Sequence, residues 1–362
     1  MARFFALPCP GVQGNEIAPF RDGPRELADR VKRKAASLGF DLCGIARAER
    51  VDPARFDRWI ERGWDGPAIA YVRERRAERL DPSLLLPGAR TVIAVAASYA
   101  PDLPEAPATG ELRVARYAQG RDYHNVVLKP ARKLAAWLRE DLGARVYCEV
   151  DTGAVLEKEW AQRAGIGWIG KNGCLIHPQL GSWLLLGALV TDLDLATDAP
   201  HPDRCGECVA CIPACPTAAI PEPRYVDAQR CLAYHTIEHR GPIPGELSRK
   251  ADGRVFGCDA CQEACPWNRR APAGKLVPLR ARPEQRALSL VETLRLTHEE
   301  ARARFTGTPL LRAGRDGLVR SALAVAKRPL APEVRELARK LLEDPAEGVR
   351  VEARGALSAT EG

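Results

Sequence analysis

The sequence is 362 residues long and contains no apolar run long enough to cross a membrane. Its first residues, MARFFALPCPGVQG, hold one arginine and a short apolar stretch that Pro8 and Pro10 interrupt, so no signal peptide is expected either. The length is enough for two or three domains with a full hydrophobic core. These absences favour a protein that stays inside the cell and contacts no membrane.

The sequence also lacks a strong excess of one charge. Its 54 Lys and Arg residues face 47 Asp and Glu residues, which leaves a formal net charge of +7. A basic balance suits a polyanionic partner such as nucleic acid. Many arginine-rich enzymes share this balance, so charge alone does not choose between the two.

Cysteine is the informative residue, because eight of the twelve cysteines lie between residues 205 and 265. The first four form the run CxxCxxCxxxCP, which is typical of a cubane iron–sulfur cluster. They are Cys205, Cys208, Cys211 and Cys215. In proteins with two such clusters the fourth cysteine of a run binds the other cluster, so a second run must exist. The chain is therefore expected to carry electrons.

The second run, Cys258, Cys261 and Cys265, lacks a leading cysteine. Cys231 is the one cysteine of the region left to fill that position. Cluster one would then bind Cys205, Cys208, Cys211 and Cys265, and cluster two would bind Cys215, Cys231, Cys258 and Cys261. Zinc sites also use paired CxxC elements, but the first run is denser than the usual zinc spacing. Iron–sulfur clusters persist in a reducing interior, which predicts a cytoplasmic protein. Disulfides are therefore not expected.

Helices and strands are predicted to alternate between residues 25 and 195, after an extension over residues 1–24. This alternation indicates one α/β domain. The predicted helices cover residues 26–40, 126–142 and 154–164, and the predicted strands cover 41–46, 89–98, 144–150 and 182–192. A Pro-rich loop runs from Pro101 to Pro107, and the cysteine region is expected to be rich in turns.

The C-terminal part contains three similar segments at a constant step of 15 residues. VRSALAVAK begins at Val319, VRELARKLL at Val334 and VRVEARGAL at Val349. This recurrence predicts stacked short helices in the manner of a HEAT-type solenoid. The alternative is three amphipathic helices that align by chance.

The segment from Gly165 to Asn172, GIGWIGKN, satisfies both the GxGxxG and the GxxxxGK nucleotide-binding patterns. A dinucleotide site should follow a strand and open a helix, whereas here a helix precedes the glycines and a strand follows them. A phosphate-binding loop needs Ser or Thr after Lys171, where Asn172 stands instead. We therefore expect these glycines to let the backbone approach a large flat ligand or another chain segment.

Asp151 is the candidate catalytic carboxylate, because it follows the predicted strand 144–150. Composition alone favours a helix N-cap there. A carboxyl group at the end of a strand is also a frequent catalytic position, and burial would raise its pKa enough to donate a proton near neutral pH. His124, His235 and His239 are further candidates, although a single histidine is more often a packed residue.

Several long segments closely resemble epoxyqueuosine reductases. They are residues 150–176 (VDTGAVLEKEWAQRAGIGWIGKNGCLI), 205–220 (CGECVACIPACPTAAI), 231–239 (CLAYHTIEH) and 257–268 (GCDACQEACPWN), with weaker matches at 80–93 and 115–127. The resemblance spans about residues 25–360. It also includes Cys231 as the extra ligand, in agreement with the cysteine count.

The resemblance implies an α+β protein of three parts after the extension. They are a nitroreductase-like α/β cobalamin-binding domain (25–197), a ferredoxin-like domain with two [4Fe-4S] clusters (198–275) and HEAT-like helical repeats (285–360). Members reduce epoxyqueuosine to queuosine at the wobble position of tRNA with a GUN anticodon, which includes the aspartate, asparagine, histidine and tyrosine tRNAs. An external low-potential donor supplies the electrons, and a monomer is expected.

The resemblance also implies the roles of individual residues. Asp151 matches the proton donor, and electrons would pass from the clusters to the corrin and then to the epoxide, directly or through a cobalt–carbon adduct. The residues expected beside cobalamin are Asp151, Asn172, Leu175, Gly257, Cys258, Asp259 and Ala260. Members often have methionine where Ile69 stands, two residues before Tyr71, so no side-chain contact is assigned there. Cys9, Cys43, Cys148 and Cys174 are expected to be packed, inert thiols.

Two other functions remain open from the sequence. A corrinoid reductive dehalogenase would use the same cofactors on a small organohalide, but such enzymes usually carry an export signal and no helical-repeat tail. An electron-transfer module of the ferredoxin type would bind no corrin, so a visible spectrum would distinguish it.

Overall fold

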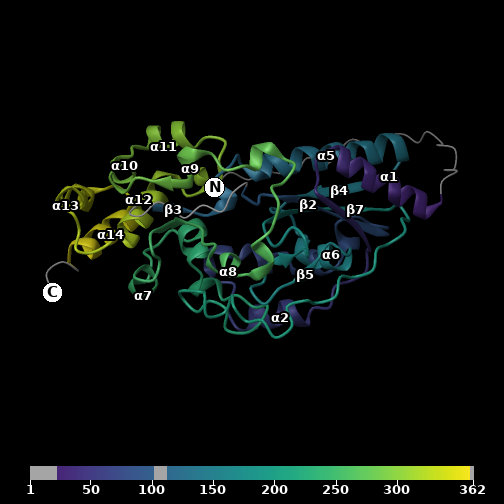
Figure 1. Ribbon diagram of the computed structural model, residues 1–362, viewed down its shortest axis with the longest axis horizontal. Coiled ribbons are helices and arrows are strands. Elements are labelled where there is room, and N and C mark those ends of the chain that lie inside the picture. The colour runs from purple at the N-terminus through teal and green to yellow at the C-terminus, as the bar shows by residue number, and fades with distance from the viewer. Residues whose placement is uncertain (1–22, 102–111, 359–362) are drawn as a thin grey trace.

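The computed structural model describes residues 23–101 and 112–358. The architecture is mixed α+β, with a sheet and its helices at one end and a group of C-terminal helices at the other (Figure 1). Nearly all of the predicted N-terminal extension and of the Pro-rich loop lies outside the described residues. Within the described ranges, no helix has the length and apolar character needed to cross a membrane.

The larger sheet has four strands in the order β1-β2-β7-β4, and every neighbouring pair is antiparallel. Its strands are β1 (Leu42–Arg47), β2 (Thr91–Ser98), β4 (Val146–Glu149) and β7 (Leu184–Thr191). All four lie where the sequence predicts strands. Their antiparallel pairing does not follow from the alternation of helices and strands, which more often accompanies a parallel sheet.

Helices cover both faces of this sheet. They are α1 (Pro24–Ser37), α5 (Tyr123–Leu142) and α6 (Glu157–Arg163). Because side chains alternate along a strand, Ile93 and Val95 of β2 pack with α1 and α5, whereas Val92 and Ala94 pack with α6. This two-sided cover explains why all eight residues of β2 are buried. α6 begins three residues later than predicted, because residues 150–156 form a loop instead of its first turn.

Three short helices that the sequence did not predict follow β1. They are α2 (Ala54–Glu61), α3 (Tyr71–Glu74) and α4 (Arg76–Leu80). α2 presents aromatic side chains, including Phe56 and Trp59, to the cavity described below.

The glycines of the GIGWIGKN segment lie at a tight hairpin of β5 (Trp168–Ile169) and β6 (Leu175–Ile176). A Cβ atom on Gly165 would lie 2.7 Å from the carbonyl oxygen of Ala199, and one on Gly167 would lie 2.2 Å from that of Ile176. Of the two predicted reasons for these glycines, close approach of another chain segment is the observed one. No strand-to-helix nucleotide loop forms here.

A second, three-stranded sheet draws on distant parts of the chain. β3 (Leu112–Val114) pairs in parallel with β8 (Arg254–Phe256) and antiparallel with β9 (Ala287–Leu288). The short helices near it are α7 (Gly245–Ser248), α8 (Ala260–Glu263) and α9 (Pro283–Arg286). One hydrophobic core runs from this sheet into the C-terminal helices. The cysteine region thus packs against the second sheet and against the C-terminal helices.

The C-terminal part is helical, as predicted. Its helices are α10 (Leu290–Arg295), α11 (His298–Phe305), α12 (Gly314–Val325), α13 (Pro332–Lys340) and α14 (Glu347–Ser358). The last three contain the segments that recur every 15 residues. α12 is the central one, because every residue from Gly317 to Val325 is buried.

Asn268, at the end of the second cysteine run, attaches that run to the larger sheet. Its Oδ1 accepts the N–H of Ser182 at 2.6 Å, and its Nδ2 donates to the Ser182 hydroxyl at 2.9 Å and to the Gln262 carbonyl at 2.7 Å. Gly181 has no room for a side chain, because a Cβ there would lie 2.1 Å from Asn268 Oδ1. The start of β7 and the second run therefore form one rigid unit.

Arg320 connects α12 to the cysteine region from inside the core. It is 1% exposed, and its guanidinium donates to the carbonyls of His235 at 2.5 Å, His239 at 2.6 Å and Gly241 at 2.9 Å. Burial lowers the pKa of Arg320 to about 10, which leaves it charged at neutral pH. One buried cation thus satisfies three backbone acceptors in and just after the π-helical turn Tyr234–Glu238.

Replacing Arg320 with methionine should lower the free energy of unfolding by on the order of 3 kcal/mol, because three buried carbonyls lose a charged donor. The measurement is thermal unfolding of anaerobic protein, followed by circular dichroism. Arg339→Met, at an exposed position of α13, is the matched control and should unfold like the wild type. Equal unfolding midpoints for the two variants would contradict this role of Arg320.

Candidate functional site

Asp151 lies in a loop after β4 and does not cap a helix. α6 begins at Glu157 with Leu156 at its N-cap, so the capping role that composition favoured is wrong. The backbone of Asp151 has φ 64°, in the left-handed region that residues with a side chain rarely adopt. Such a conformation persists only where surrounding contacts hold it, and it is common at active sites.

The carboxylate of Asp151 is held by two neighbouring residues at the start of α5. The Tyr123 hydroxyl donates to Asp151 Oδ2 at 2.8 Å, and His124 Nε2 lies 3.0 Å from the same oxygen. The other ring nitrogen, His124 Nδ1, lies 2.8 Å from Asp122 Oδ1. A histidine between two carboxylates donates from both nitrogens, so His124 is an imidazolium here.

These contacts decide which group carries the proton. Hydrogen bonds to Asp122 and Asp151 raise the pKa of His124 to about 9, against the opposing effect of burial. Burial opposes ionisation of Asp151, but the hydrogen bonds from His124 and Tyr123 outweigh it and lower the pKa of this carboxyl. Burial thus acts on Asp151 in the expected direction, but the net shift of its pKa is downward and not upward as expected. The Asp151 side chain is 54% exposed, so it remains accessible to a reactant.

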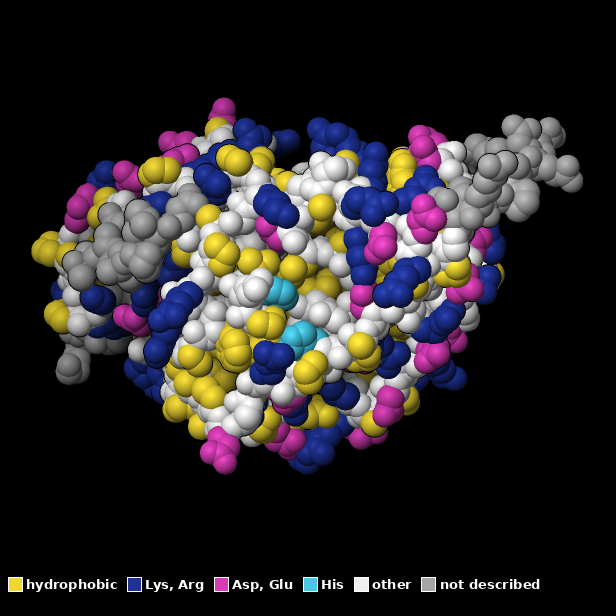
Figure 2. Space-filling model, turned by 45° about the vertical axis from the view of Figure 1, so that its right-hand side comes forward, with side chains coloured by type: hydrophobic (Ala, Val, Ile, Leu, Met, Phe, Trp, Pro, Cys, Tyr) yellow, Lys and Arg dark blue, Asp and Glu magenta, His cyan; other side chains and the backbone are white. Residues whose placement is uncertain are grey.

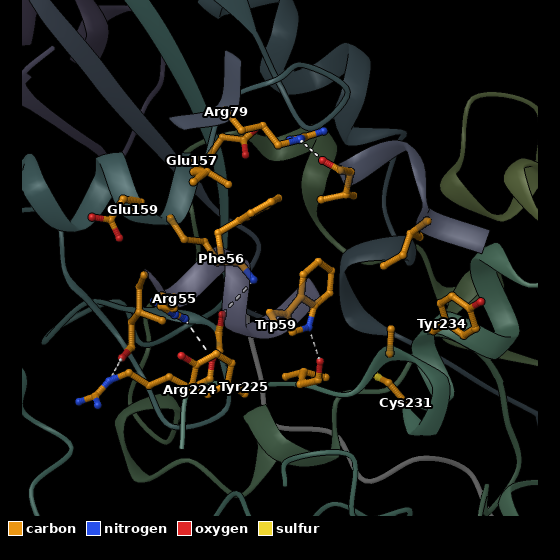
Figure 3. Close-up of a pocket in the computed structure, with 18 of the residues that line it drawn as sticks. Arg55, Phe56, Trp59, Arg79, Glu157, Glu159, Arg224, Tyr225, Cys231 and Tyr234 are labelled. Atoms are coloured by element: carbon orange, nitrogen blue, oxygen red, sulfur yellow. Dashed lines mark hydrogen bonds between the residues drawn. The ribbon is translucent and has the colours of Figure 1, made fainter. Parts of the chain in front are cut away.

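A cavity of about 540 Å³ lies beside the Asp151 loop. Glu157 and Arg79 belong to its wall (Figure 3). Each also makes a hydrogen bond to the loop. Much of the remaining wall is apolar or aromatic and comes from α2, α6 and residues 224–238. Its apolar members include Val51, Phe56, Trp59, Ile69, Val72, Val155, Ile169 and Val226.

The seven cysteines of the two runs and Cys231 form two groups in the structure. Burial raises the pKa of Cys211 to about 11, and the nearby thiols of Cys265, Cys205 and Cys208 reinforce the shift. In the second group, burial raises the pKa of Cys231 and of Cys258. The nearby thiol of Cys215 adds to the shift of Cys231, and the thiol of Cys231 adds to that of Cys258. The thiols of Cys231 and Cys258 also lie near Cys261 and contribute to its raised pKa. The assignment of these thiols to two clusters stays a prediction.

The second cysteine group adjoins the cavity. Cys231 is itself part of the cavity wall, next to the π-helical turn Tyr234–Glu238 (Figure 3). Among the described residues, no three His, Cys, Asp or Glu side chains converge on the position of a single metal ion. In a cubane each thiolate binds a different iron, so the ligands surround a volume instead of one point. Buried thiols must also lose their protons to bind iron.

Cys174, which the sequence predicted to be a packed and inert thiol, has a specific partner. It lies against the second group, where a hydrogen bond to Cys261 lowers the pKa of Cys174 and raises that of Cys261. No sequence signal indicated this contact, because Cys174 belongs to neither cysteine run.

Asn172 and Leu175 lie on the hairpin next to the cavity and do not line it, whereas their neighbours Ile169 and Gly173 do. Asn172 is 4% exposed, and its Oδ1 accepts the N–H of Cys174 at 3.1 Å. Leu175 is 3% exposed and packs in the core beneath α6. Both positions shape the hairpin from within.

The turn from Gly257 to Ala260 packs against residues 115–117. A Cβ atom on Gly257 would lie 2.5 Å from Ala115 Cβ, and Asp259 Oδ2 accepts the N–H of Arg116 at 2.7 Å. Burial raises the pKa of Asp259 to about 6. The Tyr117 ring lies 5.7 Å from the Tyr123 ring in an edge-on contact, so this turn reaches the Asp151 site through two aromatic side chains.

The other two candidate histidines have packing roles. His235 Nε2 lies 2.7 Å from the carbonyl oxygen of Gln229, and the His239 ring stacks on Tyr234. Burial lowers the pKa of both histidines, so they are neutral at pH 7. The structure therefore brings only His124 to Asp151.

Sequence reasoning missed four residues of this site, namely Tyr123, Arg79, Glu157 and Arg312. Arg312 comes from the C-terminal part, and its guanidinium donates twice to Glu238 on the cavity wall, at 2.9 and 2.7 Å. Tyr123 is adjacent to His124 in the motif GRDYH, which could have suggested it. No local signal indicated the other three, because each reaches the site through tertiary contacts.

Two family models match this chain. The 4Fe-4S double cluster binding domain matches residues 204–268, and Epoxyqueuosine reductase QueG, DUF1730, matches residues 79–152. Among curated proteins, an epoxyqueuosine reductase from Gloeobacter violaceus is 49% identical over 249 residues, which are 67% of this chain and 77% of the relative. One from Pseudomonas aeruginosa is 37% identical over 342 residues, 92% of this chain and 94% of the relative.

Solved structures agree with these matches. An epoxyqueuosine reductase crystallised with an epoxyqueuosine-modified tRNA-Tyr stem loop has a TM-score of 0.79 and 26% identity, covering 93% of this chain and 99% of its own. The enzyme from Bacillus subtilis, captured with the loop of its catalytic aspartate swung out of the active site, has a TM-score of 0.78 and 26% identity. It covers 92% of this chain and 99% of its own.

The charged state of His124 should make stability depend on pH. Its folded pKa is raised from 6.5 to about 9, so the stabilisation is complete below pH 6.5 and is lost as the pH rises through about 9. We expect the unfolding midpoint in urea to fall over this range. Asp122→Asn keeps a good N-cap for α5 but removes one of the two anionic partners of His124, so it should reduce this dependence of stability on pH. Equal slopes for variant and wild type would show that His124 is not held as an imidazolium.

Proposed function

Because the chain belongs to the epoxyqueuosine reductase family, we propose that it reduces epoxyqueuosine to queuosine at the wobble position of tRNA, the last step of queuosine biosynthesis. One observation carries the proposal most directly. An accessible carboxylate paired with an imidazolium lies beside a large apolar cavity, and a group of clustered cysteines borders the same cavity. A proton source, a cofactor-sized space and a path for electrons thus meet at one place.

We propose that the cavity holds cobalamin, and the residues present fit such a group. Its aromatic walls, including Phe56 and Trp59, suit a broad apolar ring. Arg55 and Arg224, also in the wall, can meet the phosphate and amide groups at the edge of the cofactor. When bound, cobalamin supplies a low-valent cobalt centre that passes electrons to the substrate.

We propose that the two cysteine groups bind two [4Fe-4S] clusters. Cys205, Cys208, Cys211 and Cys265 would hold one cluster, and Cys215, Cys231, Cys258 and Cys261 would hold the other. The second cluster is assigned to the inner position, because Cys231 lies on the cavity wall. Cys208 is exposed, so an external low-potential donor is proposed to reach the first cluster.

Reduction of the epoxide to an alkene consumes two electrons and two protons and releases one water molecule. The developing alkoxide needs a proton where its carbon–oxygen bond breaks. His124 holds a proton on Nε2, 3.0 Å from Asp151 Oδ2, and Asp122 stabilises the charge from the other side of the ring. We propose that Asp151 faces the substrate, that His124 supplies Asp151 with the proton, and that Asp151 passes this proton to the substrate. Tyr123 keeps the carboxylate directed at the site.

The proposed partner is tRNA with a GUN anticodon, which includes the aspartate, asparagine, histidine and tyrosine tRNAs. On the face shown in Figure 2, hydrophobic and histidine side chains gather in the middle and Lys and Arg side chains surround them. Basic side chains can neutralise phosphates around an opening while the wobble base enters it. The proposed clusters need a reducing compartment, so we place the protein in the cytoplasm, as a monomer.

We also propose the finer assignment of the three parts. The four-stranded antiparallel sheet with its helices would be the nitroreductase-like cobalamin domain, residues 25–197, and residues 198–275 the ferredoxin-like domain. The helices of residues 285–360 would be HEAT-like repeats, since the segments that start at Val319, Val334 and Val349 recur at a constant step of 15 residues. In the Bacillus subtilis relative, the loop of the catalytic aspartate has a position outside the active site. We propose that the Asp151 loop has such a second position.

The direct test is anaerobic incubation with cobalamin, a low-potential reductant and epoxyqueuosine-containing tRNA, followed by mass spectrometry of the nucleosides. We expect queuosine to appear. A protein with full iron content and a corrin spectrum that forms no queuosine would refute the proposed activity.

Asp151→Asn should abolish turnover while both clusters and the corrin spectrum remain. The amide keeps the shape of the side chain but cannot take the proton from His124 and pass it on. We expect the rate to fall on the order of 10²- to 10⁴-fold, the usual contribution of a general acid. Retained turnover would remove Asp151 from the chemistry.

Cys231→Ser should remove or degrade the second cluster, so that the iron content falls from about eight towards about four atoms per chain. Cys174→Ser is the matched control, because Cys174 contacts Cys261 but lies outside the proposed ligand set. It should keep the full iron content. Loss of iron from Cys174→Ser and not from Cys231→Ser would mean that the ligand set is wrong.

A further inference from the structure

The loop that carries Asp151 has a strained backbone, with Asp151 in the left-handed region, and is exposed to solvent at Asp151 and Thr152. Specific contacts must therefore hold the loop in place. The contacts of its carboxylate with Tyr123 and His124 must change whenever a proton moves. These side-chain contacts are therefore a poor means of fixing the loop through a catalytic cycle.

The backbone of the loop has two further anchors. Glu157, the first residue of α6, accepts the N–H of Asp151 on its Oε1 at 3.0 Å. Arg79, at the end of α4, donates from Nη1 to the carbonyl of Gly153 at 3.2 Å. Neither bond involves the Asp151 side chain. Both therefore persist while the carboxylate exchanges its proton.

Arg79 can anchor the loop, because its own side chain is held in place. It is 8% exposed, and its Nε also donates to the carbonyl of Val72 at 3.0 Å, so one guanidinium joins the loop to α3. Burial lowers the pKa of Arg79, and the charge of Glu157 acts against this shift. The two anchors are thus opposite charges near each other on the wall of the cavity (Figure 3).

The bond from the Asp151 N–H does not require Glu157 to be ionised. Burial raises the pKa of Glu157 to about 7. Either form of the carboxyl group keeps an oxygen that can accept the N–H. An uncharged amide at this position would keep an acceptor as well.

We propose that Glu157 and Arg79 form a clamp that holds the Asp151 loop in its inward position by its main chain. They are positioning residues that act through Asp151. The catalytic part of this inference rests on the proposed function, whereas the clamp itself is a property of the loop. Because both residues belong to the cavity wall, a ligand that fills the cavity would press against the same two anchors.

The test is amide hydrogen exchange of residues 147–156 in the cluster- and cobalamin-loaded protein, measured by mass spectrometry. Glu157→Leu removes the acceptor and should make this segment exchange roughly tenfold faster, because the loop opens more often. Glu157→Gln keeps an acceptor and should stay within about twofold of the wild type. Glu159→Leu is the matched control for exchange, because Glu159 lies on the same helix but accepts from Arg163 at 2.8 Å instead.

Arg79→Lys is a second, milder variant that keeps the positive charge but cannot reach both carbonyls. It should also speed exchange of the segment. Iron content and the corrin spectrum report whether each variant is folded and loaded. Wild-type exchange rates in both Glu157→Leu and Arg79→Lys would overturn the clamp.

Turnover separates the clamp from the proposed function. Glu157→Leu should lower kcat on the order of 10²-fold through misplacement of Asp151, with KM for the modified tRNA within about threefold of wild type. Glu157→Gln should restore most of the kcat. If the wild type forms no queuosine, the proposed function fails, and the exchange rates still decide whether the clamp exists. Faster exchange with unchanged kcat would overturn the positioning role.

Discussion

The attachment of the second cysteine run to the start of β7 is the constraint on which the rest of the site depends. Asn268 makes three hydrogen bonds there, and Gly181 leaves no space between the two segments. This contact fixes the cysteine region against the larger sheet. It thereby sets where Cys231 borders the cavity and where the turn at Gly257 meets Tyr117. Were the run to shift, neither the cavity nor the Asp151 site would keep its present walls.

The electrostatics of the site depend on the same arrangement. Tyr123 and His124 start a helix packed on the sheet, whereas Asp151 comes from a loop at the edge of that sheet. Their meeting stores a proton on His124 and leaves the carboxylate ionised. A carboxyl group buried by itself would do the opposite. The partners of Asp151, and not its depth, therefore decide its protonation.

Much of the fold and part of the site could be predicted from the sequence. The periodicity of hydrophobic residues and the positions of turn residues predicted the four strands of the larger sheet and the C-terminal helices, because these signals are local. α6 was predicted to begin too early, because Ala154 and Val155 are buried in the last part of the loop and Leu156 serves as the N-cap. Arg79, Glu157 and Arg312 escaped prediction for a different reason. A charged residue on a short helix has no pattern that tells which distant backbone it will contact.

By itself, the sequence determined the chemistry that this protein can carry. The spacing of the cysteines predicts two interleaved ligand sets and points to Cys231 as the eighth ligand, because ligand number is a matter of counting. Only the tertiary structure decided how that chemistry is directed. It paired Asp151 with His124, placed Cys231 and Glu157 on one cavity wall, and drew Cys174 to Cys261. Distances between segments far apart in the chain set these contacts, and such distances follow from packing and not from any local pattern.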